Sequence, residues 1–217
     1  MDGGTTFDEL VAAQQQREPV AAARAAGKIE KIKPDPDVPR LLRAAQAART
    51  VAQRVVWLHR TASAWTRPMA TVAACRKGCS ACCFQAVSIS QTEAELIGRT
   101  IGRRPTEVID AVHPHASFDS AERQAREERL RASWAGSACP FLSEGECSIY
   151  DVRPFACRTL INLDDDPLLC QIVPSRPASV PYANAQYLLA MWAMAQPNAK
   201  LADIREFFPS ESTAAST

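Results

Sequence analysis

The sequence lacks the features typical of secreted, membrane-spanning and nucleic-acid-binding proteins. Its most apolar stretch, residues 187–195, is about half of the roughly 20 apolar residues that a membrane-spanning helix needs. The first residues show no basic start followed by an apolar segment, so we expect no secretory signal. The 25 Lys and Arg residues nearly balance the 24 Asp and Glu residues, which argues against a nucleic-acid partner or an anionic membrane surface. The expectation is a soluble cytoplasmic protein with no membrane and no nucleic-acid partner.

Histidine and local catalytic motifs are also scarce. Of the three histidines, we expect His59 to be a packing or surface residue and His113 and His115 to lie on a surface loop. No phosphate-binding loop, dinucleotide fingerprint or zinc-protease helix motif occurs. No serine, histidine and aspartate carry a local nucleophile signature. The sequence names no catalytic residue, and it leaves open whether the protein is an enzyme.

Cysteine, in contrast, is abundant. The chain has eight cysteines, and in a reducing compartment such a count favours metal binding over a disulfide framework. The adjacent residues Cys82 and Cys83 point the same way, because a disulfide between neighbours is strained. We therefore interpret the cysteines as metal ligands.

The cysteines fall into two sets. The stretch "CRKGCSACC" holds Cys75, Cys79, Cys82 and Cys83, and the second set is Cys139, Cys147, Cys157 and Cys170. Thiolates are soft ligands that suit zinc, iron or an iron–sulfur cluster. The second set lies in a proline-rich segment with little helical periodicity, so we expect it to be held in place by meeting the first set at a metal site. Two zinc ions would use all eight thiolates, a four-iron cluster would use four, and both arrangements stay open.

Basic residues flank the cysteines. Because metal-bound thiolates carry net negative charge, nearby cations and N–H donors stabilise them. We expect Arg153 and Arg158 to serve as such cofactor-binding donors, with Arg158 favoured because it follows Cys157 directly. Arg76 and Lys77 are equally well explained as surface residues.

The predicted fold class is mainly α: a small helical domain with irregular loops and a short strand, stapled by the cysteine-rich metal site, plus a long N-terminal helix. We expect a mobile segment over residues 1–37, the metal-binding domain over 71–208 and a disordered tail over 209–217. The stretch "AVSIS" predicts the strand. Ser90 and Glu93 have the spacing of a capping box and predict a helix start.

The long helix is predicted over residues 38–70. Apolar residues recur there at steps of three and four, which places them on one helix face; they are Leu41, Ala44, Ala48, Val51, Val55, Leu58, Ala62 and Trp65. This Leu41–Trp65 stripe either packs on its own domain or contacts a protein partner or a second copy of the chain.

The stretches "CRKGCSACC", "CPFL" and "CSIYDVRPFACR", followed by Cys170, resemble the CxxCxxCC, or YkgJ-type, family of zinc- or iron-chelating proteins over about residues 72–175. The resemblance implies a metal-ligand role for all eight cysteines, although three residues separate Cys75 from Cys79 where the family's namesake pattern has two. Some relatives are described as flagellin lysine N-methylases with an iron–sulfur centre. The resemblance thus implies a zinc or iron cofactor and allows, as alternatives, a protein-modifying enzyme or a zinc-stapled interaction module.

Overall fold

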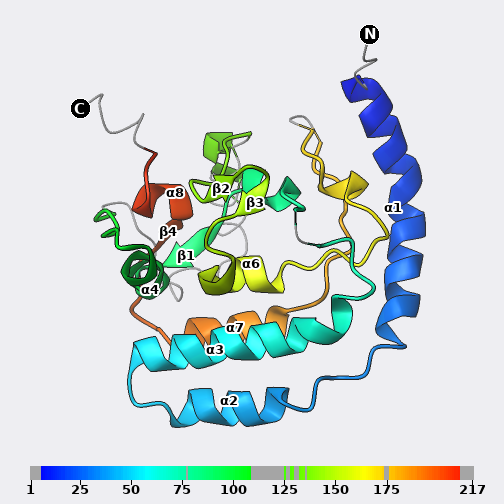
Figure 1. The fold of residues 1–217 in the computed structure, drawn as a ribbon. Coiled ribbons are helices and arrows are strands. Elements are labelled where there is room, and N and C mark those ends of the chain that lie inside the picture. The colour runs from blue at the N-terminus through cyan, green and yellow to red at the C-terminus, as the bar shows by residue number, and fades with distance from the viewer. Residues whose placement is uncertain are drawn as a thin grey trace.

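The fold is mainly helical, as the sequence predicts (Figure 1). It is taken from a computed structural model that describes residues 6–76, 78–108, 125, 128–129, 132–134, 136–173 and 176–210. Within these ranges the helices are α1 (Phe7–Ile29), α2 (Val38–Ala47), α3 (Val51–Thr66), α4 (Gln91–Ile101), α6 (Phe155–Thr159), α7 (Gln186–Met194) and α8 (Ile204–Phe207). Short 3-10 turns lie at Arg67–Met69, Ala81–Phe84, Tyr150–Val152 and Leu168–Cys170. His113, His115 and residues 211–217 of the predicted tail lie outside the described residues.

Two small antiparallel pairs of strands complete the described structure. Strand β1 (Ser88–Ser90) pairs with β4 (Leu201–Asp203), and β2 (Leu142–Ser143) pairs with β3 (Glu146–Cys147). The strand expected in "AVSIS" is therefore confirmed. The capping box at the start of α4 is confirmed as well, because Ser90 Oγ accepts the N–H of Glu93. Within the described helices, none is both long enough and apolar enough to cross a membrane.

The helix predicted over residues 38–70 is divided into two. Helix α2 ends at Ala47, and α3 begins after Thr50. The Thr50 side chain accepts the N–H of Gln53, and the Gln53 side chain accepts the N–H of Thr50. This reciprocal capping starts a new helix, and α2 packs along α3 (Figure 1). The apolar spacing continues across the break, so periodicity alone did not reveal it.

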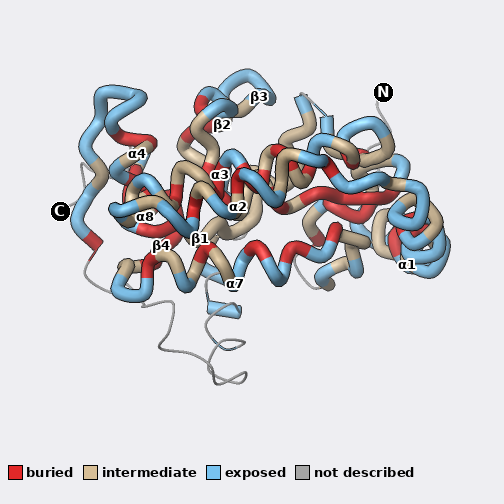
Figure 2. Tube along the Cα trace, turned by 90° about the horizontal axis from the view of Figure 1, so that it is seen from below, coloured by how far each residue is buried: buried red, intermediate tan, exposed pale blue. Residues whose placement is uncertain are grey.

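The apolar stripe on α2 and α3 faces the interior of the chain. Val55 and Ala62 are 0% exposed and Leu58 is 1% exposed. With Phe155 and Trp192 they lie where α3 packs against α6 and α7. Seen from below, much of α1 is exposed (Figure 2). The chain's own helices thus cover the stripe, in line with its role as a core face.

The segment expected to be a mobile lead-in contains the 23-residue helix α1. This helix runs alongside the loop that leads to Cys170 (Figure 1). Fully buried Gln14 donates to the carbonyls of Leu168 (3.1 Å) and Gln171 (2.9 Å), and Arg17 pairs with the buried carboxylate of Asp164 at 2.8 Å. These contacts with the Cys170 loop are polar. A docked helix is recognised in a sequence by an apolar stripe, so the sequence did not indicate that α1 packs on this loop.

The carboxylate of Glu93 connects three helices. This side chain is 0% exposed. Its Oε1 hydrogen-bonds His59 Nε2 of α3 at 2.8 Å and accepts the N–H of Phe155, the first residue of α6, at 2.7 Å. Its Oε2 accepts the N–H of Ser90, directly before α4, at 3.0 Å. His59 is buried, so it acts as a packing residue. Glu93 therefore holds the first turn of α6, which carries Cys157, against α3 and α4.

We predict that Glu93→Ala lowers the free energy of unfolding by about 3 kcal/mol, because it leaves buried donors of His59, Ser90 and Phe155 unpaired. Urea unfolding measures the loss. Glu95→Ala is the matched control, since Glu95 is exposed on the same helix and its removal should change stability by no more than about 0.5 kcal/mol. Equal, small effects of both substitutions would contradict the role of Glu93.

Candidate metal centre

The eight cysteines lie on short irregular segments and on the small elements between them. Cys82 and Cys83 are in the 3-10 turn Ala81–Phe84, Cys147 is in β3, Cys157 is in α6, and Cys170 ends the turn Leu168–Cys170. Cys75 and Cys79 precede the first of these turns, and Cys139 precedes β2. All eight are free thiols, of which Cys170 is buried and the others are partly exposed.

Asn162 brings Cys75 and Cys170 together. Its backbone N–H donates to Cys75 Sγ and its side-chain Nδ2 donates to Cys170 Sγ, both at 3.3 Å. Burial, followed by the charge of the neighbouring Cys75, raises the pKa of Cys170 to about 11, and Cys79 contributes in the same direction. Burial likewise raises the pKa of Cys75. Cys75, Cys79 and Cys170 therefore form one group of interacting thiols, which the two-set reading of the sequence did not predict.

A second group forms around Cys139. Its N–H donates to the carbonyl of Cys83 at 2.7 Å, and the β2–β3 hairpin brings Cys147 close. The Cys139 thiol accepts the N–H of Phe141, and the Cys147 thiol accepts the N–H of Ile149. Such N–H donors favour the thiolate form and orient the sulfur atom, as bound metals require.

The adjacent residues Cys82 and Cys83 share a hydrogen bond between their side chains. This bond lowers the pKa of Cys82 and raises that of Cys83. The charge of Cys82 acts in turn on Cys147 and Cys157, and also on Cys75 in the first group. Cys82 therefore interacts with both groups, and it is the first of the pair to become a thiolate.

Arg153 is the basic residue whose charge reaches both groups. Its charge contributes to the lowered pKa of Cys82 and opposes the rise in the pKa values of Cys75, Cys147 and Cys157. Its guanidinium carbon lies 4.1 Å from the ring centroid of Tyr150. Its Nε is buried and has no hydrogen-bond partner within the described part of the chain.

Arg158, which the sequence favoured, uses its donors elsewhere. Its Nε donates to the carbonyl of Arg153 at 2.8 Å, and its two terminal nitrogens donate to Ser63 Oγ at 2.7 Å and to the carbonyl of Asp151 at 2.5 Å. These bonds tie α6 to α3 and shape the loop that presents Arg153. Arg153 acts on the thiols through its charge, and Arg158 is hydrogen-bonded to the carbonyl of Arg153; the cofactor-binding role expected of both stays a prediction. Arg76 is exposed, and Lys77 lies outside the described residues.

Arg205 is a further residue of the centre that the sequence analysis did not find. It is 5% exposed and pairs with the buried Asp203 at 3.0 Å. Its guanidinium also donates to the carbonyls of Cys83 (3.1 Å) and Ser137 (2.7 Å). It thereby joins the segment around Cys83 to the segment that leads into Cys139. The signal in the sequence that could have indicated this role is the position of Arg205 between the apolar residues Ile204 and Phe207, both of which are buried.

The thiols are gathered but are not yet arranged as ligands. Among the described residues, no three His, Cys, Asp or Glu side chains stand close enough together to hold a metal ion. Most of these thiols have raised pKa values, so they are protonated at neutral pH. Metal binding must therefore release protons and rotate cysteine side chains between staggered positions.

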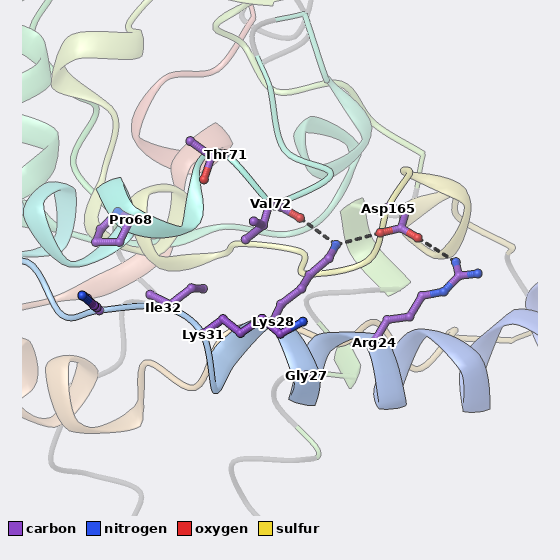
Figure 3. A pocket seen from close by; sticks show the side chains of 10 residues that line it. Arg24, Gly27, Lys28, Lys31, Ile32, Pro68, Thr71, Val72 and Asp165 are labelled. Atoms are coloured by element: carbon purple, nitrogen blue, oxygen red, sulfur yellow. Dashed lines mark hydrogen bonds and ion pairs between the residues drawn. The ribbon is translucent and has the colours of Figure 1, made fainter.

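A hollow of about 740 Å³ lies away from the cysteines, at the carboxyl end of α1 (Figure 3). Its lining includes Arg24, Lys28, Lys31 and Asp165. Lys28 Nζ donates to the carbonyl of Val72 at 2.7 Å and pairs with Asp165 at 2.8 Å, and Asp165 also pairs with Arg24 at 2.8 Å. These charges hold α1 to the loop beside it, which is a structural role.

Comparison with known proteins identifies the class of this chain. The CxxCxxCC family, described as "Putative zinc- or iron-chelating domain", matches residues 74–198, and this is more than half of the 217 residues. The chain belongs to this family, and all eight cysteines lie within the match. Helices α1, α2 and α3 precede it. No curated protein and no solved structure matches the chain.

The residues present fit a bound zinc or iron. The chain supplies eight soft sulfur donors, peptide N–H donors to Cys75, Cys139 and Cys147, and the unpartnered cationic Nε of Arg153. This combination matches the surroundings that metal thiolates require.

We predict that the metal-free protein loses stability as the pH rises from about 8.5, the ordinary thiol pKa, to about 11, the pKa of Cys170. In this range the unfolded chain binds fewer protons than the folded one, so the free energy of unfolding falls with pH. Urea unfolding across the range measures the slope, and Cys170→Ser should flatten it. A wild-type stability that stays constant or rises would contradict the prediction.

We predict that Arg153→Gln weakens zinc binding about tenfold, because it removes positive charge that favours the thiolate forms of four cysteines. Competition with a chelator in the absence of oxygen measures the affinity. Arg99→Gln is the control, since Arg99 is exposed on α4. An unchanged affinity in Arg153→Gln would remove this residue from the centre.

Proposed function

We propose that the protein is a cytoplasmic metal-binding protein that holds zinc or iron through its eight cysteines, within a domain of residues 71–208. The observation that carries this proposal is that the charge of Arg153 acts on four thiols from separate segments, Cys75, Cys82, Cys147 and Cys157. Family membership supports zinc or iron chelation.

Each part of the chain has a task in this function. Peptide N–H groups and Arg153 stabilise the thiolate forms of the cysteines, while Glu93 and Arg205 fix the segments that carry them. Bound zinc would supply a structural link between the segments, and iron would add the ability to exchange electrons. Because Cys139, Cys147, Cys157 and Cys170 lie on segments with little regular structure, metal binding would contribute directly to folding.

Two alternatives remain distinct from this proposal. An iron–sulfur enzyme resembling flagellin lysine N-methylases would need a substrate cavity beside the cysteines, and the hollow at the carboxyl end of α1 has no cysteine in its lining. A zinc-stapled interaction module would need an outward-facing surface, whereas the Leu41–Trp65 stripe faces the core. Both observations favour metal binding as the function.

We predict that protein purified without oxygen retains zinc or iron, and that Cys157→Ser and Cys79→Ser lose metal and make residues 139–181 sensitive to protease. Elemental analysis and limited proteolysis measure these effects. Thr100→Ala, at an exposed position of α4, is the control and should retain the metal. Wild-type protein that neither contains nor takes up zinc or iron would refute the proposed function.

The same preparation separates the alternatives. A brown protein with absorption near 400 nm and acid-labile sulfide supports the iron–sulfur enzyme. A colourless protein with about two zinc ions supports the interaction module and excludes an iron–sulfur centre.

A further inference from the structure

Helix α1 buries little apolar surface where it lies against the loop that leads to Cys170, residues 163–171. Its buried residues are one glutamine and two alanines, whereas Phe7 is 64% exposed and Val20 is 44% exposed. Two alanine side chains contribute little hydrophobic free energy. Hydrogen bonds and ion pairs therefore decide whether α1 stays docked on this loop.

Pro19 divides α1 into two halves, residues 7–18 and residues 20–29. A proline has no N–H, so the helical hydrogen bond to the carbonyl four residues earlier is missing at this position. The helix is therefore weakest at Pro19, where one half can move while the other stays docked.

The C-terminal half is anchored inside the chain. Lys28 Nζ donates to the carbonyls of Val72, Leu163 and Asp164 at 2.7, 2.8 and 3.1 Å, and Figure 3 shows the first of these bonds. Ala25 belongs to the same buried apolar cluster as Leu163. Because several bonds would have to break at once, this half stays in place.

The N-terminal half is held by ion pairs near the surface. Arg17 pairs with Asp164 at 2.8 Å and with Asp166 at 2.7 Å. The next residue, Glu18, pairs with Arg176 at 2.7 Å. The side chain of Asp164 is completely buried, and the other four are between 20% and 45% exposed. Dissolved ions screen charges that are in contact with water, so the docking of this half weakens as the ionic strength rises.

Gln14 connects the N-terminal half to the turn that carries Cys170. Its Nε2 donates to the carbonyls of Leu168 and Gln171, which lie on either side of Cys170 in the chain. Cys170 is the one buried thiol of the eight. Since no three candidate ligands within the described residues stand close enough to hold a metal ion, a metal site that includes Cys170 requires this turn or its neighbours to shift. A docked Gln14 opposes that shift.

We propose that residues 7–18 of α1 form a latch on the loop of residues 163–171, which opens about Pro19 and sets the rate at which metal enters and leaves the site that contains Cys170. This inference rests on the proposed function, because it assigns Cys170 to a bound metal. Water takes up the polar groups that the open latch frees, so opening is reversible and leaves the rest of the chain folded. The rate of metal exchange is then proportional to the fraction of molecules with an open latch.

The first test is hydrogen–deuterium exchange of residues 163–171 in the metal-free, full-length protein. Gln14→Ala should speed this exchange about tenfold, because it removes two hydrogen bonds of the docked state. Gln15→Ala is the matched control, since Gln15 is the next residue and is exposed. Low urea concentrations should leave exchange of the loop unchanged and should speed exchange of β1, which opens when the whole chain unfolds.

The second test is the transfer of zinc from the loaded, full-length protein to a chelator, without oxygen. The relevant kinetic phase is the one that is absent in Cys170→Ser. Raising sodium chloride from about 0.05 M to about 0.5 M should speed this phase in the wild type. In Arg17→Gln the phase should be fast at both concentrations, because the ion pairs that salt screens are already lost.

Pro19→Ala should act in the opposite direction. It restores the missing backbone donor at an exposed position and makes bending of the helix there less favourable. Zinc transfer should therefore slow about fivefold relative to the wild type, since fewer molecules have an open latch. A substitution that only disturbed the fold would not slow the transfer.

Two results would overturn the inference: exchange of the loop that is the same in Gln14→Ala and Gln15→Ala, and zinc transfer that is not slowed in Pro19→Ala. In both cases the wild type still holds zinc, so the proposed function stands. A wild type that takes up neither zinc nor iron refutes the proposed function and with it the control of metal exchange. Hydrogen exchange of the metal-free chain then still shows whether the latch opens.

Discussion

The buried carboxylate of Glu93 is the contact on which the arrangement of the cysteines depends. It receives hydrogen bonds from α3, from the start of α4 and from the first peptide of α6. Arg153 precedes that peptide by two residues and Cys157 follows it by two. A carboxylate completely shielded from water is stable only when its lone pairs are satisfied, so the three elements are held in the one arrangement that satisfies them. The position of the cation among the thiols follows from this constraint.

Polar contacts of the same kind hold the rest of the irregular region. Arg205 joins the chain near Cys83 to the chain before Cys139, and Asn162 joins Cys75 to Cys170. Apolar burial alone gives little directional preference, whereas a hydrogen bond fixes both distance and angle. A centre that must bring thiols from separate segments together therefore relies on buried polar side chains to set their positions before any metal is present.

The sequence predicted the parts of this structure that depend on local pattern or on chemical type. The eight cysteines could be named from the softness of thiolates, and the start of α4 from the spacing of Ser90 and Glu93. The break between α2 and α3 was missed because apolar residues continue through it at helical spacing. Asn162 and Arg205 were missed because their partners lie elsewhere in the chain. Long-range polar contacts leave no periodic signal.

Helix α1 gives the clearest view of where the folding unit ends. It precedes the family match at residues 74–198, yet Gln14 and Arg17 supply partners to the carbonyls of Leu168 and Gln171 and to the buried Asp164 inside that match. A chain cut at the family boundary would expose or orphan these groups directly before and after Cys170. The family match therefore begins later in the chain than the set of segments that hold the Cys170 loop in place. Part of the support for the metal-binding loop comes from a stretch of chain outside the family that defines it.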